Sequence, residues 1–192
     1  MARRLTRAFY RRDPRVVAPE LLGKVLVAPG VAGRIVEVEA YCGSEDPGSH
    51  AYRGPTKRNL TMFGPAGHLY VYFTYGMHWC ANVVCGDEGQ GVAVLLRAVA
   101  PTTGLDLVRA RRPKARRDRD LTSGPARLCQ AFDLDGRHDG LDLVRAERGV
   151  TVVDDGTPPL PGTISTRIGL SAGADLPWRW SVAGDPNLSK PA

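Results

Sequence analysis

The stretch HLYVYFTYGMHWCANVVC, residues 68–85, decides the fold class, because it predicts two strands that are joined by a tight turn. Residues with a high strand propensity flank a central Thr-Tyr-Gly-Met segment, residues 74–77, whose glycine suits a turn. The stretch therefore predicts a β-hairpin with Tyr75 at its tip. It also holds five aromatic residues in a chain that is only 7% aromatic.

The aromatic side chains of this hairpin fall into groups, because successive side chains of a strand point to opposite faces. Tyr70 and Tyr72 share one face with Thr74, and the opposite face, which we expect to be core, carries Leu69, Val71 and Phe73. The tyrosine face allows two interpretations: aromatic pairs that stabilise the sheet, or a pocket in which a flat base stacks. Tyr75 cannot be core, and a ring protruding from a turn could enter a base stack.

Segments on either side of the hairpin predict further strands and a few helices. Helices are predicted at residues 13–24, with Asp13 as the N-cap, and at residues 122–132, with Ser123 as the N-cap. Strands are predicted at residues 24–30, 32–43, 91–101, 149–155, 166–170 and 177–184. With 192 residues the chain is too short to argue for two domains, so we predict one α+β domain, residues 1–192, with a mostly antiparallel sheet.

The composition predicts a basic protein inside the cell. No apolar run approaches the roughly 20 residues of a membrane span, and the basic N-terminus lacks the apolar centre of a signal peptide. We therefore expect a cytoplasmic, nucleoid-associated protein without a membrane partner, and four reduced cysteines. The net charge is +6, and 22 of the 26 basic residues are arginine. This bias favours a polyanionic partner, although genomic base composition would produce it equally well.

One segment, RARRPKARRDRD at residues 109–120, carries seven basic side chains. Runs of like charge are usually solvated, so the stretch from Arg109 to Arg119 could simply be a flexible exposed loop. The alternative is an arm that lies near phosphates. Both interpretations stay open at the level of the sequence.

The strand IVEVEAY, residues 35–41, alternates apolar and polar side chains. One face would carry Val36, Val38 and Ala40, and the other would carry Ile35, Glu37, Glu39 and Tyr41. The acidic face is either exposed to solvent or lines a cleft in which one carboxylate acts as a general base. Alternation does not say which glutamate that would be.

A polar loop, residues 43–59, follows this strand and contains His50, Arg53, Lys57 and Arg58. These side chains are either merely exposed or form a wall of a site for an anionic ligand. The chain lacks glycine-rich phosphate loops, the GxSxG and HExxH motifs and the paired CxxC of a zinc site, so we expect no metal and no cofactor. Any chemistry would then use carboxylates, histidine, tyrosines and water.

Together these stretches resemble the alkyladenine (3-methyladenine) DNA glycosylases, which are monofunctional enzymes that remove alkylated and deaminated purines. The blocks EAY (39–41), YVYxxYGMxxCxN (70–82) and SGPxxLxQA (123–131) carry the resemblance, which runs from about residue 7 to residue 183. It implies a single domain with its core in that range, a curved antiparallel sheet, flanking helices and a protruding β-hairpin. It also implies that no metal or other cofactor is needed.

The resemblance implies roles for the residues that would hold the base. Glu39 matches the glutamate that activates a water molecule for attack on the sugar. Tyr41, His50 and Tyr72 match the walls that receive the flipped base. Asn82 matches the asparagine that screens purine substituents at the edge of the base.

It also implies contacts with the duplex. Tyr75 matches the wedge that fills the gap left by the base, and Met77 matches a residue beside it. Arg97 matches a cleft arginine near the nucleotide backbone. Further backbone contacts are expected from the loop cations Arg53, Lys57 and Arg58.

The expected function is therefore base excision by a monomer that acts on double-stranded DNA containing damaged purines. The enzyme would flip the base, hydrolyse the N-glycosidic bond with water and leave an abasic site. Because no lysine falls within the pocket motifs, water is expected as the nucleophile, and a protonated His50 could assist a neutral leaving base such as hypoxanthine. Two alternatives remain: a non-catalytic binder of damaged or structured nucleic acid would not need Glu39, and an enzyme for free nucleosides would not need Tyr75.

Overall fold

Two long strands form the centre of the protein. The computed structural model describes residues 2–158 and 160–190, and in it β3 (Val31–Cys42) pairs with β6 (Val92–Thr103) along nearly its whole length. The hairpin of β4 (Leu69–Thr74) and β5 (His78–Cys85) extends the sheet, because β5 pairs with β6. The predicted hairpin at residues 68–85 is thus confirmed.

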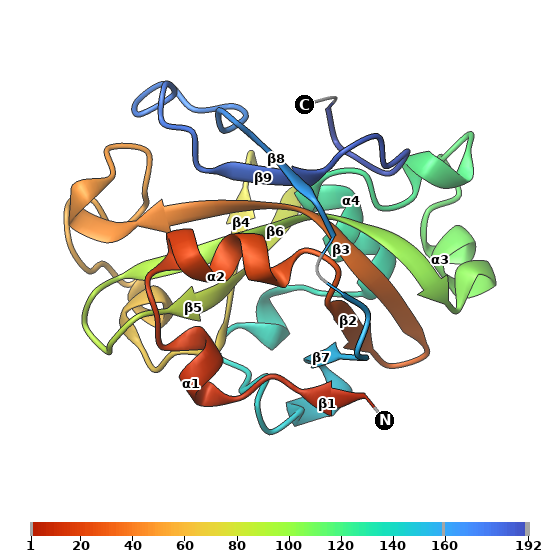
Figure 1. Ribbon diagram of the computed structural model, residues 1–192, viewed down its shortest axis with the longest axis horizontal. Coiled ribbons are helices and arrows are strands. Elements are labelled where there is room, and N and C mark those ends of the chain that lie inside the picture. The colour runs from red at the N-terminus through yellow and green to blue at the C-terminus, as the bar shows by residue number, and fades with distance from the viewer. Residues whose placement is uncertain (1, 159, 191–192) are drawn as a thin grey trace.

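The rest of the sheet lies on the other side of β3. Its order is β1-β7-β2-β3-β6-β5-β4, and all of these pairs are antiparallel. The added strands are β1 (Arg3–Arg4), β2 (Val25–Ala28) and β7 (Thr151–Asp154). A second hairpin, β8 (Gly162–Ser165) and β9 (Arg179–Val182), joins through β9 to the middle of β3. Figure 1 shows that the resulting sheet is strongly curved.

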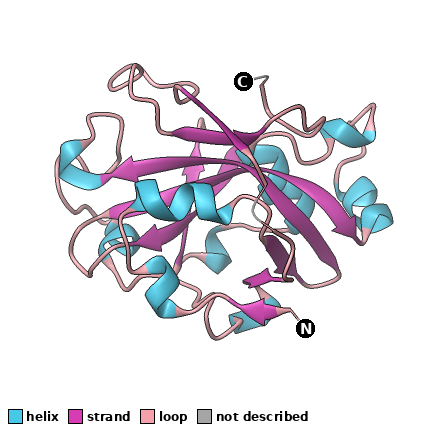
Figure 2. Cartoon of the chain, in the orientation of Figure 1, coloured by secondary structure: helices cyan, strands magenta, loops and turns pink. Residues whose placement is uncertain are grey.

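Short helices surround this sheet (Figure 2). The α-helices are α1 (Arg7–Tyr10), α2 (Pro14–Leu21), α3 (Leu105–Arg111) and α4 (Pro125–Phe132). The 3₁₀ turns are η1 (Gly43–Glu45), η2 (Leu60–Phe63), η3 (Asp118–Asp120), η4 (Gly136–His138) and η5 (Glu147–Gly149). Buried side chains of α2 and α4 join those of β3, β5 and β6 in one apolar core, which confirms the predicted α+β class.

The helix ends show which capping predictions hold. The Asp13 side chain accepts a hydrogen bond from the backbone N–H of Arg15, so it caps α2 as predicted. The predicted cap of the second helix is wrong, because Gly124 occupies the N-cap position of α4 and has no side chain to offer. The Ser123 hydroxyl accepts a hydrogen bond from Arg127 Nη1 instead.

The predicted strand at residues 166–170 is also wrong, since this stretch is a loop and the neighbouring strand is β8. Its polar groups form hydrogen bonds with the middle of β3 and with the loop that follows β3, and not with a neighbouring strand. The backbone N–H of Ile168 donates to Glu39, and the Arg167 guanidinium donates to Ala40 O and Asp46.

A bulge in β3 alters the predicted faces of this strand. Ile35 pairs with Val99 and Glu37 with Ala98, so Val36 is an extra residue without a partner across the ladder. As a result Ile35, rather than Val36, joins Val38 and Ala40 in the apolar core. The register shifts once more between Glu37 and Val38, where Arg97 of β6 has no partner in the ladder, and Glu37, Glu39 and Tyr41 share the opposite face as predicted.

The tip of the β4–β5 hairpin projects beyond the sheet. Leu69 and Val71 belong to the core, but Phe73 is 43% exposed, so its predicted core position is wrong. It lies near the tip of the hairpin and packs on its cross-strand neighbour Trp79, with ring centroids 4.8 Å apart. Phe73 and Trp79 therefore form a cross-strand aromatic pair, whereas Tyr70 and Tyr72 stack on each other along β4.

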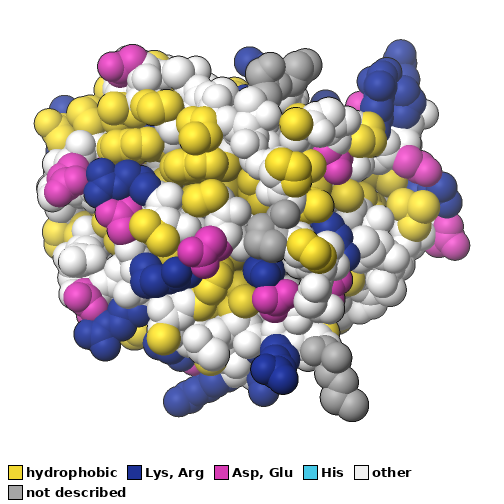
Figure 3. All heavy atoms as spheres, viewed as in Figure 1, with side chains coloured by type: hydrophobic (Ala, Val, Ile, Leu, Met, Phe, Trp, Pro, Cys, Tyr) yellow, Lys and Arg dark blue, Asp and Glu magenta, His cyan; other side chains and the backbone are white. Residues whose placement is uncertain are grey.

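All four cysteines are buried and free of disulfides. Within residues 2–158 and 160–190, no helix is long and apolar enough to cross a membrane. Figure 3 shows positive side chains projecting at the upper right, over the segment that follows α3.

Candidate active site

The two glutamates of β3 lie in the interior of the protein. Glu37 and Glu39 are both 0% exposed, which excludes the interpretation of this face as solvent-facing. The loop at residues 166–170 and the segment at residues 185–190 cover this side of β3 and supply backbone donors to the carboxylates. Burying two carboxylates is costly unless cations and hydrogen bonds compensate, so their partners define the site.

Glu37 is surrounded by donors. Its Oε1 accepts hydrogen bonds from Arg97 Nε at 2.9 Å, Arg179 Nε at 2.9 Å and Ser189 Oγ at 2.6 Å, and its Oε2 accepts one from Ser189 N at 2.7 Å. Burial raises the pKa of Glu37, but Arg97, the Ser189 hydrogen bonds and Arg179 outweigh it, and the net pKa lies below the ordinary value. Four donors thus reach Glu37, three of them at Oε1, and two of the four come from arginines.

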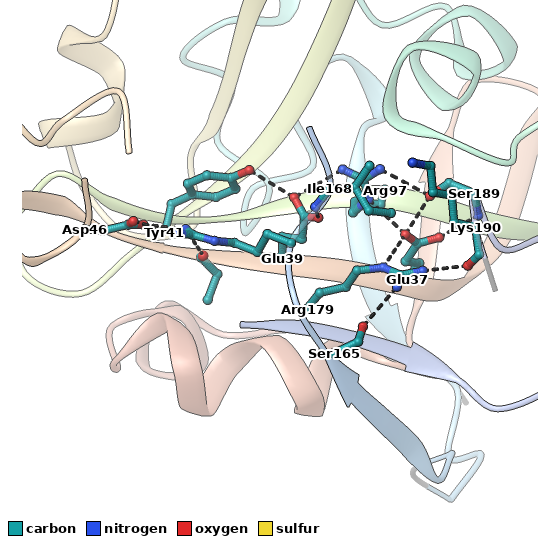
Figure 4. A network of polar contacts seen from close by, with 12 residues as sticks. Glu37, Glu39, Tyr41, Asp46, Arg97, Ser165, Ile168, Arg179, Ser189 and Lys190 are labelled. Atoms are coloured by element: carbon teal, nitrogen blue, oxygen red, sulfur yellow. Dashed lines mark hydrogen bonds and ion pairs between the residues drawn. The ribbon is translucent and has the colours of Figure 1, made fainter. Parts of the chain in front are cut away.

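Glu39 is held by fewer groups. Its Oε2 accepts hydrogen bonds from Tyr41 Oη at 2.9 Å and Arg97 Nη1 at 3.1 Å, and its Oε1 accepts one from Ile168 N at 2.8 Å (Figure 4). These three donors leave about one acceptor position free. All three donor residues also line a cavity, so the Glu39 carboxylate lies directly behind its wall, although Glu39 itself is not a lining residue.

Arg97 connects the two carboxylates. Burial would lower the pKa of its guanidinium, but Glu39 and Glu37 raise it, so Arg97 stays charged. The expected contact between Arg97 and the DNA backbone is not tested by this arrangement. Its buried position, with Nε on Glu37 and Nη1 on Glu39, instead favours a role within the carboxylate network.

The cavity has a volume of about 220 Å³ and is lined mainly by aromatic and polar side chains. We call it the tyrosine cavity, and its walls include Tyr41, His50, Tyr70, Tyr72, Asn82, Arg97 and Ile168. Tyr70 and Tyr72 are stacked, with ring centroids 5.4 Å apart, and the His50 ring stands edge-on to Tyr72 at 4.5 Å. The structure thus brings the predicted wall residues Tyr41, His50 and Tyr72 together.

Apart from the charged Arg97, three titratable groups of this cavity, Tyr41, Tyr70 and His50, are neutral donors or acceptors at physiological pH. Burial, together with the charge of Glu39, raises the pKa of Tyr41, and burial raises that of Tyr70 to about 12. Burial and the nearby charge of Arg58 lower the pKa of His50. A lowered pKa disfavours a protonated His50, which the sequence suggested as an aid to neutral leaving bases.

Asn82 lies on β5, directly opposite Tyr70 of β4. It is buried, and its Nδ2 donates a hydrogen bond to Tyr70 O at 3.2 Å. This bond ties the side-chain amide to the strand, while the residue still forms part of the cavity wall. Both predicted roles of Asn82, a strand contact and a wall contact, are compatible with this position.

Tyr75 occupies the tip of the hairpin and the mouth of the tyrosine cavity. It is 81% exposed, and its neighbour Met77 is 67% exposed. Tyr75 and Gly76 both have positive φ angles, +51° and +65°, as a type I′ turn requires. This backbone costs a tyrosine about 1–2 kcal/mol that glycine or asparagine would largely avoid, and such strain is often found at functional positions.

The basic side chains near the site differ in their surroundings. Arg53, Lys57 and Arg58 are exposed, and Arg58 donates to Phe73 O and lies over the Tyr72 ring at 5.7 Å. In the segment after α3, Arg111 and Arg112 donate to the backbone carbonyls of Ala131 and Leu121. Within the described residues, the basic side chains of that segment without an ion pair or hydrogen bond are Lys114, Arg116 and Arg119.

The sequence analysis missed several residues of the site. Arg167 is fully buried in a bidentate ion pair with Asp46, and its guanidinium lies 4.8 Å from the centre of the Tyr41 ring. Arg179 and Ser189 complete the shell of Glu37. The only sequence signal was an arginine within each of two largely apolar stretches, residues 166–170 and 177–182, and nothing marked Ser189.

Across residues 2–158 and 160–190, no group of three or more histidine, cysteine or acidic side chains is arranged to hold a metal ion. The chemistry available to the site is that of a buried carboxylate, a charged arginine, phenols and an imidazole. A flat ligand with polar edges fits these walls, because the rings offer stacking surfaces and Asn82 and His50 offer polar contacts.

Comparison with known proteins places this site in a family. A family model of methylpurine-DNA glycosylases matches residues 8–186, so the chain belongs to that family and is a DNA glycosylase. Three related proteins all carry the provisional name 3-methyladenine DNA glycosylase. A Burkholderia lata protein is 58% identical over 189 residues, 97% of this chain and 91% of the relative. The Streptomyces avermitilis protein is 50% identical (96% and 90% covered), and the Nitrobacter winogradskyi protein is 47% identical (97% and 88% covered).

Proposed function

We propose that this protein removes alkylated and deaminated purines from double-stranded DNA, with Glu39 as the general base. The observation that carries the proposal is the difference between the two buried carboxylates. Glu37 accepts four hydrogen bonds, whereas Glu39 accepts three, and all three donor residues of Glu39 line the tyrosine cavity, so we place the reactive water between Glu39 and this cavity. A water molecule at that position would be within reach of a base bound in the cavity.

The damaged nucleotide would leave the duplex and enter the tyrosine cavity. Unstacking the base would cost a few kcal/mol, and Tyr75 would fill the gap that the base leaves in the stack. The rings of Tyr41, His50 and Tyr72 would pack against the purine. Arg53, Lys57 and Arg58 are exposed and would bind phosphates close to the lesion.

Hydrolysis would then follow from the arrangement of the donors. Water forms a bond to C1′, the N-glycosidic bond breaks, its electron pair leaves with the base, and the proton of the water passes to Glu39. Arg97 and the Tyr41 hydroxyl would keep the Glu39 carboxylate in place during this transfer. Because no lysine lines the cavity among the described residues, a Schiff base is not part of this mechanism, and the enzyme is monofunctional.

Substrate selection would depend on the charge of the leaving base. An alkylated purine such as 3-methyladenine is cationic and leaves as a neutral molecule, so it needs little assistance. Hypoxanthine is neutral and needs a donor near its ring. A neutral His50 that accepts from the Tyr70 hydroxyl through Nδ1 would present its Nε2–H to the cavity as such a donor. We further propose that residues 1–192 act as one domain and as a monomer at the nucleoid.

The test is excision from duplexes that each carry one alkylated purine, hypoxanthine or an etheno adduct. Alkali cleavage at abasic sites measures the product. The Glu39→Gln variant should excise at least about 100-fold more slowly, the usual effect of losing a general base, while still binding the lesion. The control is Glu45→Gln, whose side chain is exposed and should leave the rate unchanged.

Two outcomes would contradict the proposal. If wild-type protein binds these duplexes and releases no base, it is a non-catalytic binder. If Glu39→Gln stays active and Glu37→Gln is inactive, the general base is Glu37.

A further inference from the structure

The described chain ends beside the carboxylate network. The segment at residues 185–190 folds into a turn in which Asn187 N donates to Asp185 Oδ1 and Leu188 N donates to Asp185 O. This turn brings Ser189 and Lys190 against Glu37 and Arg179. Both residues lie beyond the part of the chain that matches the family model, residues 8–186.

Ser189 makes three hydrogen bonds in the network. Its backbone N–H donates to Glu37 Oε2 at 2.7 Å, and its hydroxyl donates to Glu37 Oε1 at 2.6 Å. The same hydroxyl accepts a hydrogen bond from Arg97 Nη2 at 3.2 Å. A serine hydroxyl can donate once and accept at the same time, so it connects the carboxylate to the guanidinium.

Arg97 is oriented by three partners, one for each of its nitrogens. Nε donates to Glu37, Nη1 donates to Glu39 and Nη2 donates to Ser189. Because the guanidinium is planar and rigid, a rotation that follows the loss of one partner also moves the other two nitrogens. The side chain is buried, so water cannot readily replace a lost partner.

We propose that Ser189 is a positioning residue of the active site, which orients Arg97 and, through it, the carboxylate of Glu39. This inference rests on the proposed role of Glu39. Ser189 itself does not line the tyrosine cavity, whereas Arg97 does. Loss of the hydroxyl therefore leaves the aromatic walls of the cavity in place and disturbs Arg97 and the carboxylate that it orients.

The experiment measures single-turnover excision of one alkylated purine by Ser189→Ala, over a range of enzyme concentrations. Loss of hydrogen bonds to charged groups should slow the chemical step about ten- to a hundredfold. The concentration of enzyme that gives half the maximal rate should change less than about twofold, since the base-binding walls stay in place.

Two variants separate this role from a structural one. Ser189→Thr keeps the hydroxyl and should restore most of the rate. Lys190→Ala removes a side chain that is exposed, while the Lys190 carbonyl still accepts from Arg179 Nη2, so its rate should equal that of wild type. Combining Ser189→Ala with Glu37→Gln should slow excision little more than Glu37→Gln alone, because both act through Arg97.

The proposal is overturned if Ser189→Ala excises at the wild-type rate, or if it weakens binding and leaves the chemical step unchanged. It is also overturned if threonine is as slow as alanine while the melting temperature of both stays at the wild-type value. If the alanine variant is too unstable to assay, Ser189→Cys replaces it, because a thiol is a weak donor. Its excision rate should lie below the wild-type rate, by less than the roughly ten- to a hundredfold expected for alanine. A wild-type protein that releases no base would instead overturn the proposed function.

Discussion

At the scale of single residues, Glu37 and Glu39 differ in how many donors reach each carboxylate. They stand two positions apart on one strand and are equally buried, yet Glu37 accepts four hydrogen bonds and Glu39 only three. Glu37 and Glu39 together balance the charges of Arg97 and Arg179, so the network leaves none of these four buried charges unpaired.

Asn82 is the residue on which we expect selectivity against normal guanine to depend. Guanine carries an exocyclic 2-amino group that adenine and hypoxanthine lack, and stacking on tyrosines is nearly blind to it. The Asn82 amide is tied to Tyr70 O, so it cannot move away freely from an additional amino group. The resulting clash or unpaired donor would cost about 1–3 kcal/mol, or about ten- to a hundredfold in rate.

Replacing Asn82 with Ser or Ala should therefore raise the release of normal guanine relative to hypoxanthine. Both products are measured with the same variant, so hypoxanthine release serves as the internal control for folding and general activity. If the ratio of guanine to hypoxanthine release stays constant in a folded variant, Asn82 serves only the strand.

At the scale of elements, the β4–β5 hairpin contributes both to the wall of the tyrosine cavity and to the exposed surface at its mouth. Its base supplies Tyr70, Tyr72 and Asn82 to the wall of the tyrosine cavity, and its tip places Tyr75 in solvent at the mouth. The tip is also strained, because Tyr75 has a positive φ angle. Folding gains little from an exposed aromatic ring in this conformation, so a function of the ring in the complex with DNA is the more economical explanation.

Tyr75→Asn tests this explanation. Asparagine tolerates a positive φ angle, so the melting temperature should stay the same or rise slightly. Base flipping, measured with a fluorescent lesion whose emission increases on unstacking, should weaken. Tyr75→Phe keeps the ring and should flip the base normally. A large loss of melting temperature in Tyr75→Asn with normal flipping would mean that the ring serves folding instead.

At the scale of the whole molecule, some arginines are held by other groups of the protein, and others are exposed and free to contact DNA. Arg111 and Arg112 are tied to backbone carbonyls, and Arg117 pairs with Asp120, so they belong to the local structure of this segment. Arg116 and Arg119 are exposed. Arg119 also lines a groove of about 630 Å³ that contains Ser189, which places it near the carboxylate network.

Replacing Arg116 and Arg119 with Ser should therefore weaken the salt dependence of DNA binding. The slope of log K against log salt should become less steep by about 0.9 for each phosphate contact that is lost. The matched control replaces Arg3 and Arg4 with Ser, since β1 is at the opposite end of the sheet from the hairpin and the same charge is removed. Equal slopes for the two double variants would mean that the segment after α3 does not contact DNA.

The carboxylate network also predicts how stability depends on pH. Because the pKa of Glu37 is lower in the folded protein than its ordinary value of 4.5, its ion pairs stabilise the fold fully above that value. This stabilisation is lost as the pH falls through the folded pKa and Glu37 takes up a proton.

Glu37→Gln should thus lower the free energy of unfolding by roughly 3 kcal/mol at pH 7, the scale of a broken buried ion pair. The difference from wild type should shrink as the pH falls below about 4.5, where the glutamate of the unfolded chain takes up a proton, and should disappear below the lower pKa of folded Glu37. Urea unfolding of both proteins from pH 3 to pH 7 measures the difference. A difference that does not change with pH would contradict a charged Glu37 at the centre of the network.

The local chemistry of the sequence was enough to predict the β4–β5 hairpin, the Asp13 cap, the α+β class and the shared face of Glu37, Glu39 and Tyr41. These features follow from alternation, turn residues and capping, which act over a few neighbouring positions. The same reasoning failed at Ile35 and Val36, where a bulge in pairing with β6 shifts the register, and at residues 166–170, whose polar groups bond to β3 and the adjoining loop.

Only the tertiary structure decided which donors reach each glutamate. The donors to Glu37 and Glu39 come from far along the chain: Arg97 is 60 residues from Glu37, Ile168 is 129 residues from Glu39, and Ser189 is 152 residues from Glu37. Burial and hydrogen-bond satisfaction are properties of the assembled interior. A pattern along one strand can place two carboxylates on a face, but it cannot count the donors that later cover them.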